Sequence, residues 1–413
     1  MYNTIFYIIL WLFIFEFLLS KTLDYLNTLN WSVKLPDELK DIYDEKKYKK
    51  SMKYEKEKII FWTFSSIFSF IIMFFVLIFF WFGHLYDYVS LFTNNEIIKT
   101  LYFFWIIFWI QTIIWLPFSY YSTFVIEEKF WFNKMTKKIF FMDMIKSLLL
   151  TIILGWLLLS LITWIYLKTG SNFWLYTWWV VTFVSVFMMM FYSSLIVPLF
   201  NKQTPLEKGK LRTEIEKFAN KVWFKLDNIF VIDWSKRSSK ANAYFSWFWP
   251  KKRIVLYDTL IKDLSVDELV WVLAHEIGHY KRKHTLQMLL FGTLQTWLML
   301  YILWLTLKIP EISLALWSSW TSFALWMVAF WILYTPISII FWLLWNILSR
   351  KNEYEADYFA WINHNPDDLE NALIKLSRNN LSNLRPHPLY EFFNYSHPTV
   401  LKRLNALDKI KEK

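Results

Sequence analysis

Two histidines one helical turn apart are the residues in this sequence best placed to do chemistry. His275 and His279 stand at i and i+4 in the stretch HEIGH, so both imidazoles project from one face of a helix. Such a pair can bind a single Zn²⁺, and the neighbouring Glu276 can accept a proton from a water molecule at the metal. This is the H-E-x-x-H arrangement typical of a zinc peptidase. The alternative is a surface helix with two hydrogen-bonded histidines.

The surrounding sequence, VDELVWVLAHEIGHYKRKHT, predicts one helix that would position these side chains. Ser265 and Glu268 form an S-x-x-E capping box at its start. Apolar residues follow at helical spacing: Val266, Leu269, Val270, Leu273 and Ala274.

A basic cluster, Lys281 to Lys283, ends this helix where the next apolar segment begins, and we expect it to reach toward lipid headgroups. His284 follows the cluster, five residues after His279 and off the face that carries the two histidines. We therefore do not expect His284 to bind the metal.

A third metal ligand is predicted in a second polar segment, SRKNEYEADYFAW, which reads as a charged helix. A catalytic zinc site needs three protein ligands and an open position. Glu353 and Asp357 are one turn apart, so Glu353 can bind the metal while Asp357 orients a metal-binding histidine. Glu355 faces another way and is a reserve candidate. The alternative is a solvated acidic helix face.

Composition indicates a membrane protein. Of its 413 residues, 56% are hydrophobic and 22% are aromatic, well above the share in soluble domains. The absence of Cys excludes disulfides, thiolate ligands and a thiol nucleophile, so any metal must be held by His and carboxylates. The net charge of +11 favours contact with anionic membrane lipid, and no motif for binding nucleic acid accompanies it.

Seven apolar segments are long enough to cross a bilayer. The first contains a lone acidic residue, Glu16, which we expect to face the protein interior or a partner rather than lipid. The segments are 4–20, 60–83, 101–123, 147–167, 173–199, 285–307 and 317–348.

The distribution of Lys predicts the orientation in the membrane, because basic residues concentrate in cytoplasmic loops. A basic loop, 21–58, carries ten Lys and the connection 124–146 is also basic, whereas the alternate connections have almost none. The N-terminus is therefore expected outside. Both polar segments, 200–284 and the tail after 349, are expected in the cytoplasm.

This pattern divides the chain into four parts. Residues 1–199 would hold spans 1–5, and 200–284 the first peptidase segment with HEIGH. Residues 285–348 would hold spans 6–7, and 349–413 the C-terminal peptidase segment with the third ligand.

Several separated motifs together resemble the type I CAAX prenyl protease family of integral-membrane zinc metallopeptidases. They are LPFSYYSTFVIEEKF, SSKANAYF, HEIGHYKRKHT, NEYEADYFA and NYSHPTVLKRL. The resemblance implies a mostly α membrane protein with about seven transmembrane helices ringing a large intramembrane chamber. A cytoplasmic zinc metallopeptidase domain with a small β element would close this chamber.

The resemblance also implies roles for individual residues. His275, His279 and Glu353 would bind one Zn²⁺ per chain, with Glu276 as general base. His397, in YSHPT, matches a family histidine that could stabilise the oxyanion, although by spacing alone it is an ordinary loop histidine.

The stretch Asn242, Ala243 and Tyr244 matches the family's edge strand, which would pair with an extended peptide substrate. The alternative for these three residues is an ordinary half-buried strand.

The leading interpretation is a zinc endopeptidase that cleaves near the C-terminus of a membrane-proximal peptide or protein, with a prenylated C-a-a-X tail as the substrate that the resemblance suggests. One alternative is a lipid-independent protease for quality control of membrane proteins. Another is a non-catalytic scaffold with a structural zinc, but such a site does not need the base Glu276. A transporter is disfavoured because no internal repeat is evident.

Tryptophan is abundant where glycine is scarce: the chain has 27 Trp and 6 Gly. Trp234 follows a strand end, Trp247 and Trp249 fall in a hairpin connection, and Trp361 is expected just past a helix end. Trp131 departs from the family pattern in the same way. We hypothesise that UGA codons, read as Gly in some bacteria, are translated here as Trp, which predicts a bacterial inner membrane. The alternative is an interfacial aromatic belt.

Overall fold

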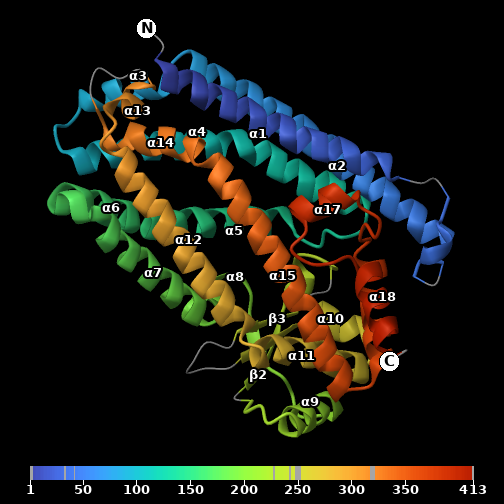
Figure 1. Cartoon of the computed structure of the whole chain (residues 1–413). Coiled ribbons are helices and arrows are strands. Elements are labelled where there is room, and N and C mark those ends of the chain that lie inside the picture. Colours follow the sequence, from blue (N-terminus) through green and yellow to red (C-terminus); the bar gives the residue numbers. More distant parts are fainter. Residues whose placement is uncertain are drawn as a thin grey trace.

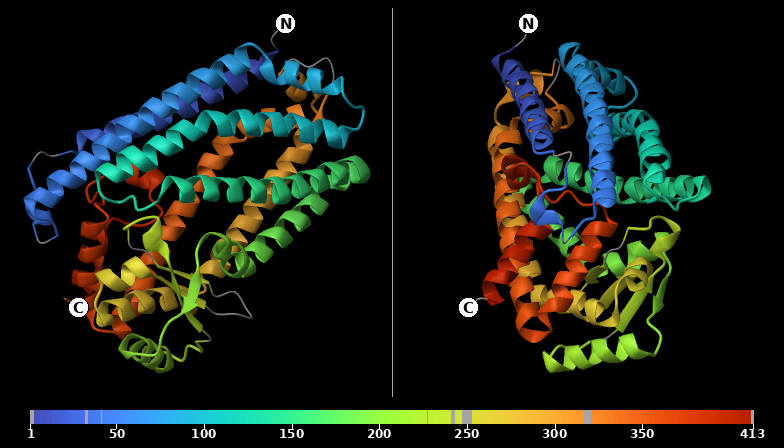
Figure 2. Two further views of the ribbon diagram at one scale, coloured as in Figure 1. Left: turned by 180° about the vertical axis from the view of Figure 1, so that it is seen from behind. Right: turned by 90° about the vertical axis from the view of Figure 1, so that its right-hand side faces the viewer.

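The computed structural model describes residues 3–31, 34–40, 42–226, 228–240, 243–246, 253–316 and 321–411. Long apolar helices form one part of the molecule, and a smaller part with a sheet lies at one end of them (Figures 1 and 2). The first helix starts at the end remote from the sheet, and the last helix lies beside the sheet-containing part (Figure 1).

The apolar part is built from long helices joined by short turns. Its longer helices are α1 (Thr4–Leu29), α2 (Glu45–Ile78), α4 (Glu96–Tyr121), α5 (Lys137–Leu150), α6 (Trp156–Thr169), α7 (Phe173–Phe191), α12 (His284–Thr306), α14 (Phe323–Leu333) and α15 (Thr335–Asn363). Shorter helices are α3 (Trp81–Ser90), α8 (Val197–Phe200) and α13 (Pro310–Leu314). π-Helical turns occupy Ser122–Glu127, Thr151–Gly155 and Tyr192–Ile196.

Within the described residues, five helical runs are long and apolar enough to cross a membrane, or six if the bent pair α14 and α15 is one span. One of these runs, Lys137–Phe200, has 64 residues. It turns back at Gly170, whose φ of 54° lies in the left-handed region, so that α6 and α7 run side by side (Figure 1). Each of the seven predicted segments therefore lies largely in these helices.

The last predicted span bends by 55° between α14 and α15. Pro336, the second residue of α15, has no N–H to continue the hydrogen bonding of α14, which explains the break. Beyond the bend, α15 continues without interruption from apolar sequence into the charged stretch that contains Glu353. The predicted charged helix and the last span are thus one helix.

The predicted basic loop 21–58 is largely helical. The first helix continues to Leu29 and α2 begins at Glu45, where the Asp44 side chain accepts a hydrogen bond from the Lys47 amide at 2.8 Å. A single 3₁₀ turn, Asp37–Leu39, lies between these helices in the part of the connection that the structure describes.

The sheet has four strands in the order β1-β2-β4-β3. The central strands β2 and β4 are parallel, and β1 and β3 add to them in antiparallel fashion at the two edges. The strands are β1 (Gln203–Pro205), β2 (Asn228–Ile232), β3 (Ala243–Ser246) and β4 (Arg253–Tyr257). This is the small β element that the resemblance implied.

Helices cover this sheet and build the second core. They are α9 (Lys210–Lys221), α10 (Asp258–Asp263), α11 (Val266–Lys281), α16 (Pro366–Asn379), α17 (Pro388–Asn394) and α18 (Val400–Lys411). The core surrounds α11, whose Trp271 and Ile277 are almost fully buried against side chains from β2, β4, α9, α15 and α16. A separate apolar cluster, which includes Phe6, Phe103 and Trp326, holds α1, α4 and α14 together.

Two tryptophans occupy backbone positions that favour glycine. Trp131 has a φ of 71° and Trp223 a φ of 52°, and the two residues are 72% and 91% exposed. Each is the left-handed residue of a Schellman cap, in which the amides after the helix bond back to its last carbonyls. These bonds are Trp131 N to Glu128 O (3.0 Å), Phe132 N to Glu127 O (2.9 Å), Trp223 N to Asn220 O (3.1 Å) and Phe224 N to Ala219 O (2.8 Å).

The other tryptophan expectations have different outcomes. Trp361 lies inside α15, which continues to Asn363, so the prediction that it follows a helix end is wrong. Trp234 begins a 3₁₀ turn and is not among the described residues with positive φ. Trp247 and Trp249 lie outside the described residues. The glycine hypothesis is thus favoured by the backbone at positions 131 and 223 and not at 234 and 361.

Replacing Trp131 or Trp223 by Gly is expected to stabilise the protein. An aromatic residue in the left-handed region costs about 1–3 kcal/mol, and these exposed rings bury little surface that would be lost. Thermal unfolding in detergent measures the effect, with Trp361→Gly, inside a helix, as a control expected to destabilise. Lower unfolding temperatures for both Trp131→Gly and Trp223→Gly would contradict backbone strain at these residues. UGG codons at both positions would contradict the hypothesis that UGA codons for Gly are translated here as Trp.

Candidate metal centre

The helix that carries HEIGH begins at the predicted capping box. The Ser265 Oγ accepts from the Glu268 amide at 3.3 Å, and the Glu268 carboxylate accepts from the Ser265 amide at 2.7 Å. Lys375 on α16 reaches the other Glu268 oxygen at 2.6 Å. The start of α11 is therefore fixed both by its own cap and by an ion pair to a neighbouring helix.

The contact between α11 and α15 depends on Gly278 in HEIGH. A methyl group at this position would lie 3.1 Å from the Ala356 Cα and carbonyl oxygen and 3.2 Å from the Phe359 Cβ. Two of these three neighbours are backbone atoms, which cannot rotate away. The absence of a side chain at Gly278 thus lets the two helices approach closely, one turn from His275 and Glu353.

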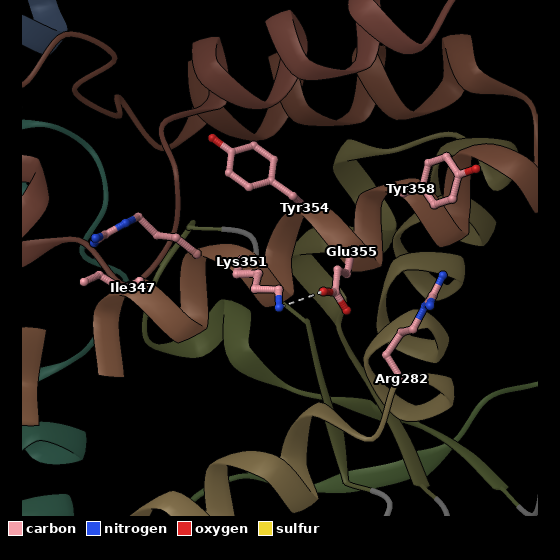
Figure 3. Close-up of a pocket in the computed structure, with 7 residues that line it drawn as sticks. Arg282, Ile347, Lys351, Tyr354, Glu355 and Tyr358 are labelled. Atoms are coloured by element: carbon pink, nitrogen blue, oxygen red, sulfur yellow. Dashed lines mark ion pairs between the residues drawn. The ribbon is translucent and has the colours of Figure 1, made fainter. Parts of the chain in front are cut away.

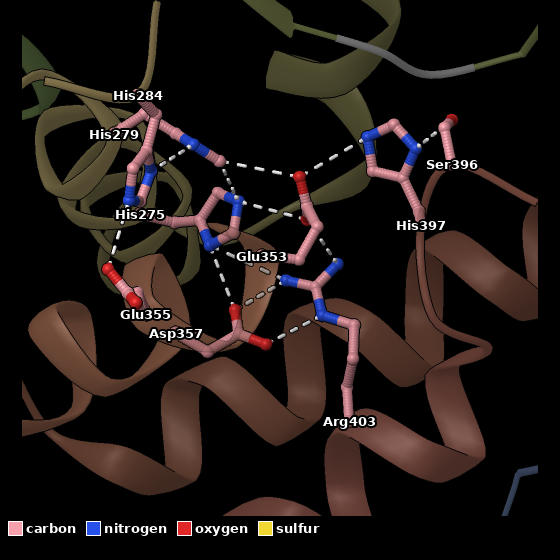
Figure 4. Close-up of polar contacts among 9 residues, drawn as sticks. All are labelled: His275, His279, His284, Glu353, Glu355, Asp357, Ser396, His397 and Arg403. Atoms are coloured by element: carbon pink, nitrogen blue, oxygen red, sulfur yellow. Dashed lines mark hydrogen bonds and ion pairs between the residues drawn. The ribbon is translucent and has the colours of Figure 1, made fainter. Parts of the chain in front are cut away.

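Three predicted ligands converge across this contact (Figure 4). The Nε2 atoms of His275 and His279 lie 3.1 Å apart, and each lies 3.4 Å from one oxygen of the Glu353 carboxylate. Among the described residues, these three side chains form a group close enough to hold one metal ion. Glu355, the reserve candidate, is not in this group.

The charges around these atoms suit a cation. Burial opposes protonation of His275, but its hydrogen bond to Asp357 and its contact with Glu353 outweigh burial and raise the pKa of His275 to about 10. Carboxylates that stabilise a proton at this buried position also favour a divalent metal ion. Two imidazoles and one carboxylate are a ligand set that zinc enzymes use.

Asp357, the residue predicted to orient a histidine, contacts His275. Its Oδ1 lies 2.8 Å from the His275 Nδ1, so the His275 Nε2 faces the Glu353 carboxylate. Arg403 on α18 binds both Asp357 oxygens, with its Nη2 at 2.5 Å and its Nε at 2.8 Å. The Arg403 Nη1 also lies 3.7 Å from Glu353.

Arg403, a further charged residue of this cluster, was not predicted from the sequence. Burial opposes its charge, but the Asp357 and Glu353 carboxylates outweigh burial and raise the pKa of Arg403. The available signal was its place in NYSHPTVLKRL, six residues after His397. Gly278 was also missed, although a glycine inside a helical pattern points to a packing reason.

The predicted general base and oxyanion residue both lie at this centre. Glu276 is half-buried on α11 next to His275, and its charge acts on Arg403. The His397 Nε2 lies 3.3 Å from the Glu353 carboxylate, its Nδ1 contacts the Ser396 hydroxyl at 2.9 Å, and 64% of its side chain is exposed. His397 thus stands at the solvent side of the cluster (Figure 4).

The predicted substrate strand lies at an edge of the sheet. Ala243 and Tyr244 belong to β3 and pair with Leu256 and Val255 of β4. Strand β4 is the only neighbour of β3 within the described sheet, so the other edge of β3 is open there. Asn242 lies outside the described residues.

His284 and Glu355 lie behind the metal ligands. Lys283 takes a left-handed conformation, with a φ of 59°, and separates α11 from α12. His284 consequently lies beside His279, with 3.0 Å between their Nδ1 atoms, and Glu355 lies 3.2 Å from the His284 Nε2. His284 is not in the candidate group of three, and its exclusion from the metal ligands stays a prediction.

Comparisons with known proteins agree with this architecture. Residues 24–202 match the CAAX prenyl protease N-terminal domain, described as five membrane helices, and residues 205–411 match peptidase family M48. The CAAX prenyl protease 1 homolog of Dictyostelium discoideum is 38% identical over 91% of this chain and 90% of that protein. The CAAX prenyl protease 1 of Saccharomyces cerevisiae is 36% identical over 92% of this chain and 90% of its own length.

The chain belongs to peptidase family M48. The crystal structure of S. mikatae Ste24p matches it with a TM-score of 0.91 and 36% identity, over 98% of this chain and 99% of that chain. The predicted fold class, family and enzyme class are thus confirmed: this is a multi-pass membrane metalloendopeptidase. The relatives named here are eukaryotic, and the bacterial origin stays a prediction.

Substituting Gly278 by Ala is expected to weaken metal binding by about 10–100-fold, the range found when groups that orient metal ligands are disturbed. The added methyl group forces α15 away from α11 and moves Glu353 relative to the histidines. Titration of the metal-free protein with zinc in the presence of a fluorescent chelator measures the affinity.

The matched control is Gly292→Ala in α12, where no atom lies within 4 Å of the added carbon. Gly292→Ala should leave the zinc affinity unchanged. An unchanged affinity in Gly278→Ala would contradict the role of close helix packing.

Proposed function

We propose that this protein is a zinc endopeptidase that hydrolyses a peptide bond near the C-terminus of membrane-proximal substrates, including prenylated C-a-a-X tails. The observation that carries the proposal is the convergence of His275, His279 and Glu353 across the contact of α11 and α15. The substrate class follows from the relatives, which are named CAAX prenyl proteases and align over most of both chains.

The proposed mechanism assigns the metal to His275, His279 and Glu353. A bound zinc ion would polarise the scissile carbonyl and lower the pKa of the attacking water. Asp357 keeps a proton on the His275 Nδ1 and leaves the Nε2 lone pair free for the ion. Arg403 balances the charge of Asp357 by binding both of its carboxylate oxygens.

Glu276 then acts as general base in the proposed reaction. It accepts the proton of the attacking water and passes it to the leaving amine. His397, exposed at the solvent side of the cluster, would donate a hydrogen bond to the oxyanion of the tetrahedral intermediate. The open edge of β3 at Ala243 and Tyr244 would pair with the extended substrate backbone.

Two matched peptides that end in Cys-a-a-X, one farnesylated and one bare, test the substrate class. We expect the farnesylated peptide to be cleaved, and Glu276→Gln to lower kcat by about 10²–10⁴-fold while it retains zinc. Equal cleavage of both peptides would instead support a general membrane-proximal protease of the quality-control type. No cleavage of either peptide by zinc-loaded protein would contradict the proposal.

We also propose that the N-terminus lies outside and that the peptidase part is cytoplasmic. The two polar segments lie at one end of the helix bundle, which supports a shared compartment for them (Figure 1). The Lys-rich start of α2 extends toward that end, whereas the connection after α12 with Lys308 lies at the other (Figure 1). Basic residues favour the cytoplasmic face.

Single cysteines can test this orientation, because the chain contains no Cys. A membrane-impermeant maleimide added to intact cells should label Lys308→Cys and not Lys47→Cys. Both should react after the membrane is permeabilised. The reverse labelling pattern would contradict the proposed orientation.

A further inference from the structure

We propose that His284 and Glu355 form a hydrogen-bonded relay that fixes the tautomer of His279 and holds its Nε2 ready for the metal. His284 and Glu355 are positioning residues in this account, since they act through His279 and do not reach the metal-binding atoms. The inference rests on the metal site of the proposed function and extends it to the groups behind the ligands.

The first contact of the relay joins two imidazoles. The Nδ1 atoms of His279 and His284 are 3.0 Å apart, and the ring centroids are 5.1 Å apart at 73°. His284 is only 4% exposed, so water cannot readily replace His279 as its partner. In a continuous helix His284 would point away from His279, but the left-handed Lys283 brings the two rings together.

The second contact gives the relay a direction. The His284 Nε2 lies 3.2 Å from the Glu355 carboxylate, which can only accept a hydrogen bond. The hydrogen of a neutral His284 is therefore on Nε2, and its Nδ1 has a lone pair. This lone pair accepts the hydrogen on the His279 Nδ1, because two neutral rings that meet at Nδ1 share one hydrogen.

The tautomer of His279 determines whether its Nε2 can bind a metal ion. With its hydrogen on Nδ1, His279 presents an unprotonated Nε2 toward Glu353 and the His275 Nε2. The opposite tautomer would place a hydrogen on Nε2 and block metal binding. The pair His284 and Glu355 thus fixes the hydrogen of His279 on its Nδ1, as Asp357 alone does for His275.

The outer end of the relay is accessible. Glu355 lines an open groove of about 550 Å³ together with Arg282, Lys351 and Tyr358, and its side chain is 37% exposed (Figure 3). Its second oxygen lies 3.7 Å from the Lys351 Nζ. Glu355 can therefore be changed without opening a cavity in the core.

The test measures zinc affinity of the full-length protein in detergent by competition with a fluorescent chelator. His284→Leu, which has no acceptor, is expected to weaken zinc binding by about 10–100-fold. His284→Asn places a carbonyl oxygen where it can accept from the His279 Nδ1, and it is expected to recover most of the affinity. Thermal unfolding checks that each variant is folded.

Glu355→Ala is expected to weaken zinc binding, whereas Lys351→Ala, which removes the groove partner of Glu355, should leave the affinity unchanged. The double variant His284→Leu with Glu355→Ala should bind no more weakly than His284→Leu alone, because both changes break one chain. If the losses of zinc affinity in the two single variants add in the double variant, the proposed relay would be overturned.

Two further outcomes would overturn the inference. Unchanged affinity in a folded His284→Leu variant would show that His284 has no effect on the metal. Equal losses of zinc affinity in His284→Leu and His284→Asn would show that His284 has a packing role and does not control the tautomer of His279. The variant His275→Ala tests the metal site of the proposed function separately from the relay. Zinc binding that survives this change would overturn the metal site itself.

Discussion

The close contact of α11 with α15 at Gly278 and Ala356 brings together the side chains of the candidate metal centre. The histidines and the carboxylate come from segments more than seventy residues apart, with a membrane helix, α12, and the bent α14 between them. Neither helix could place Glu353 between the two histidines if a side chain separated the backbones. The candidate metal centre thus depends on a glycine in one helix that faces an alanine in the other.

Close packing of α11 and α15 buries two acidic side chains, whose charges are balanced by an arginine from α18. Glu353 and Asp357 are 5% and 2% exposed, and burying two carboxylates side by side is costly unless they are paired. Arg403 on α18 contacts both of them, and His275 also contacts both. The C-terminal segment is therefore part of the centre, and its binding to α15 also carries His397 to the site.

Local spacing made much of this site predictable. HEIGH and NEYEADYFA encode which side chains share a helix face, and the capping box marks the start of α11. The candidates His275, His279, Glu353 and Asp357 could therefore be named from the sequence. Long-range pairing is not encoded in this way, and Arg403 was missed for that reason. The contact of His284 with His279 was not predicted either, because it depends on a left-handed residue, Lys283, that the spacing does not reveal. Trp361 was misplaced because α15 continues past its apolar stretch without a glycine or proline to stop it.

Anomalous diffraction at the zinc absorption edge, from crystals of the purified protein, would locate the metal directly. We expect one anomalous peak per chain, within bonding distance of the Nε2 atoms of His275 and His279 and of the Glu353 carboxylate. A zinc peak bound by other residues, or none at this position in protein that cleaves its peptide substrate, would contradict it.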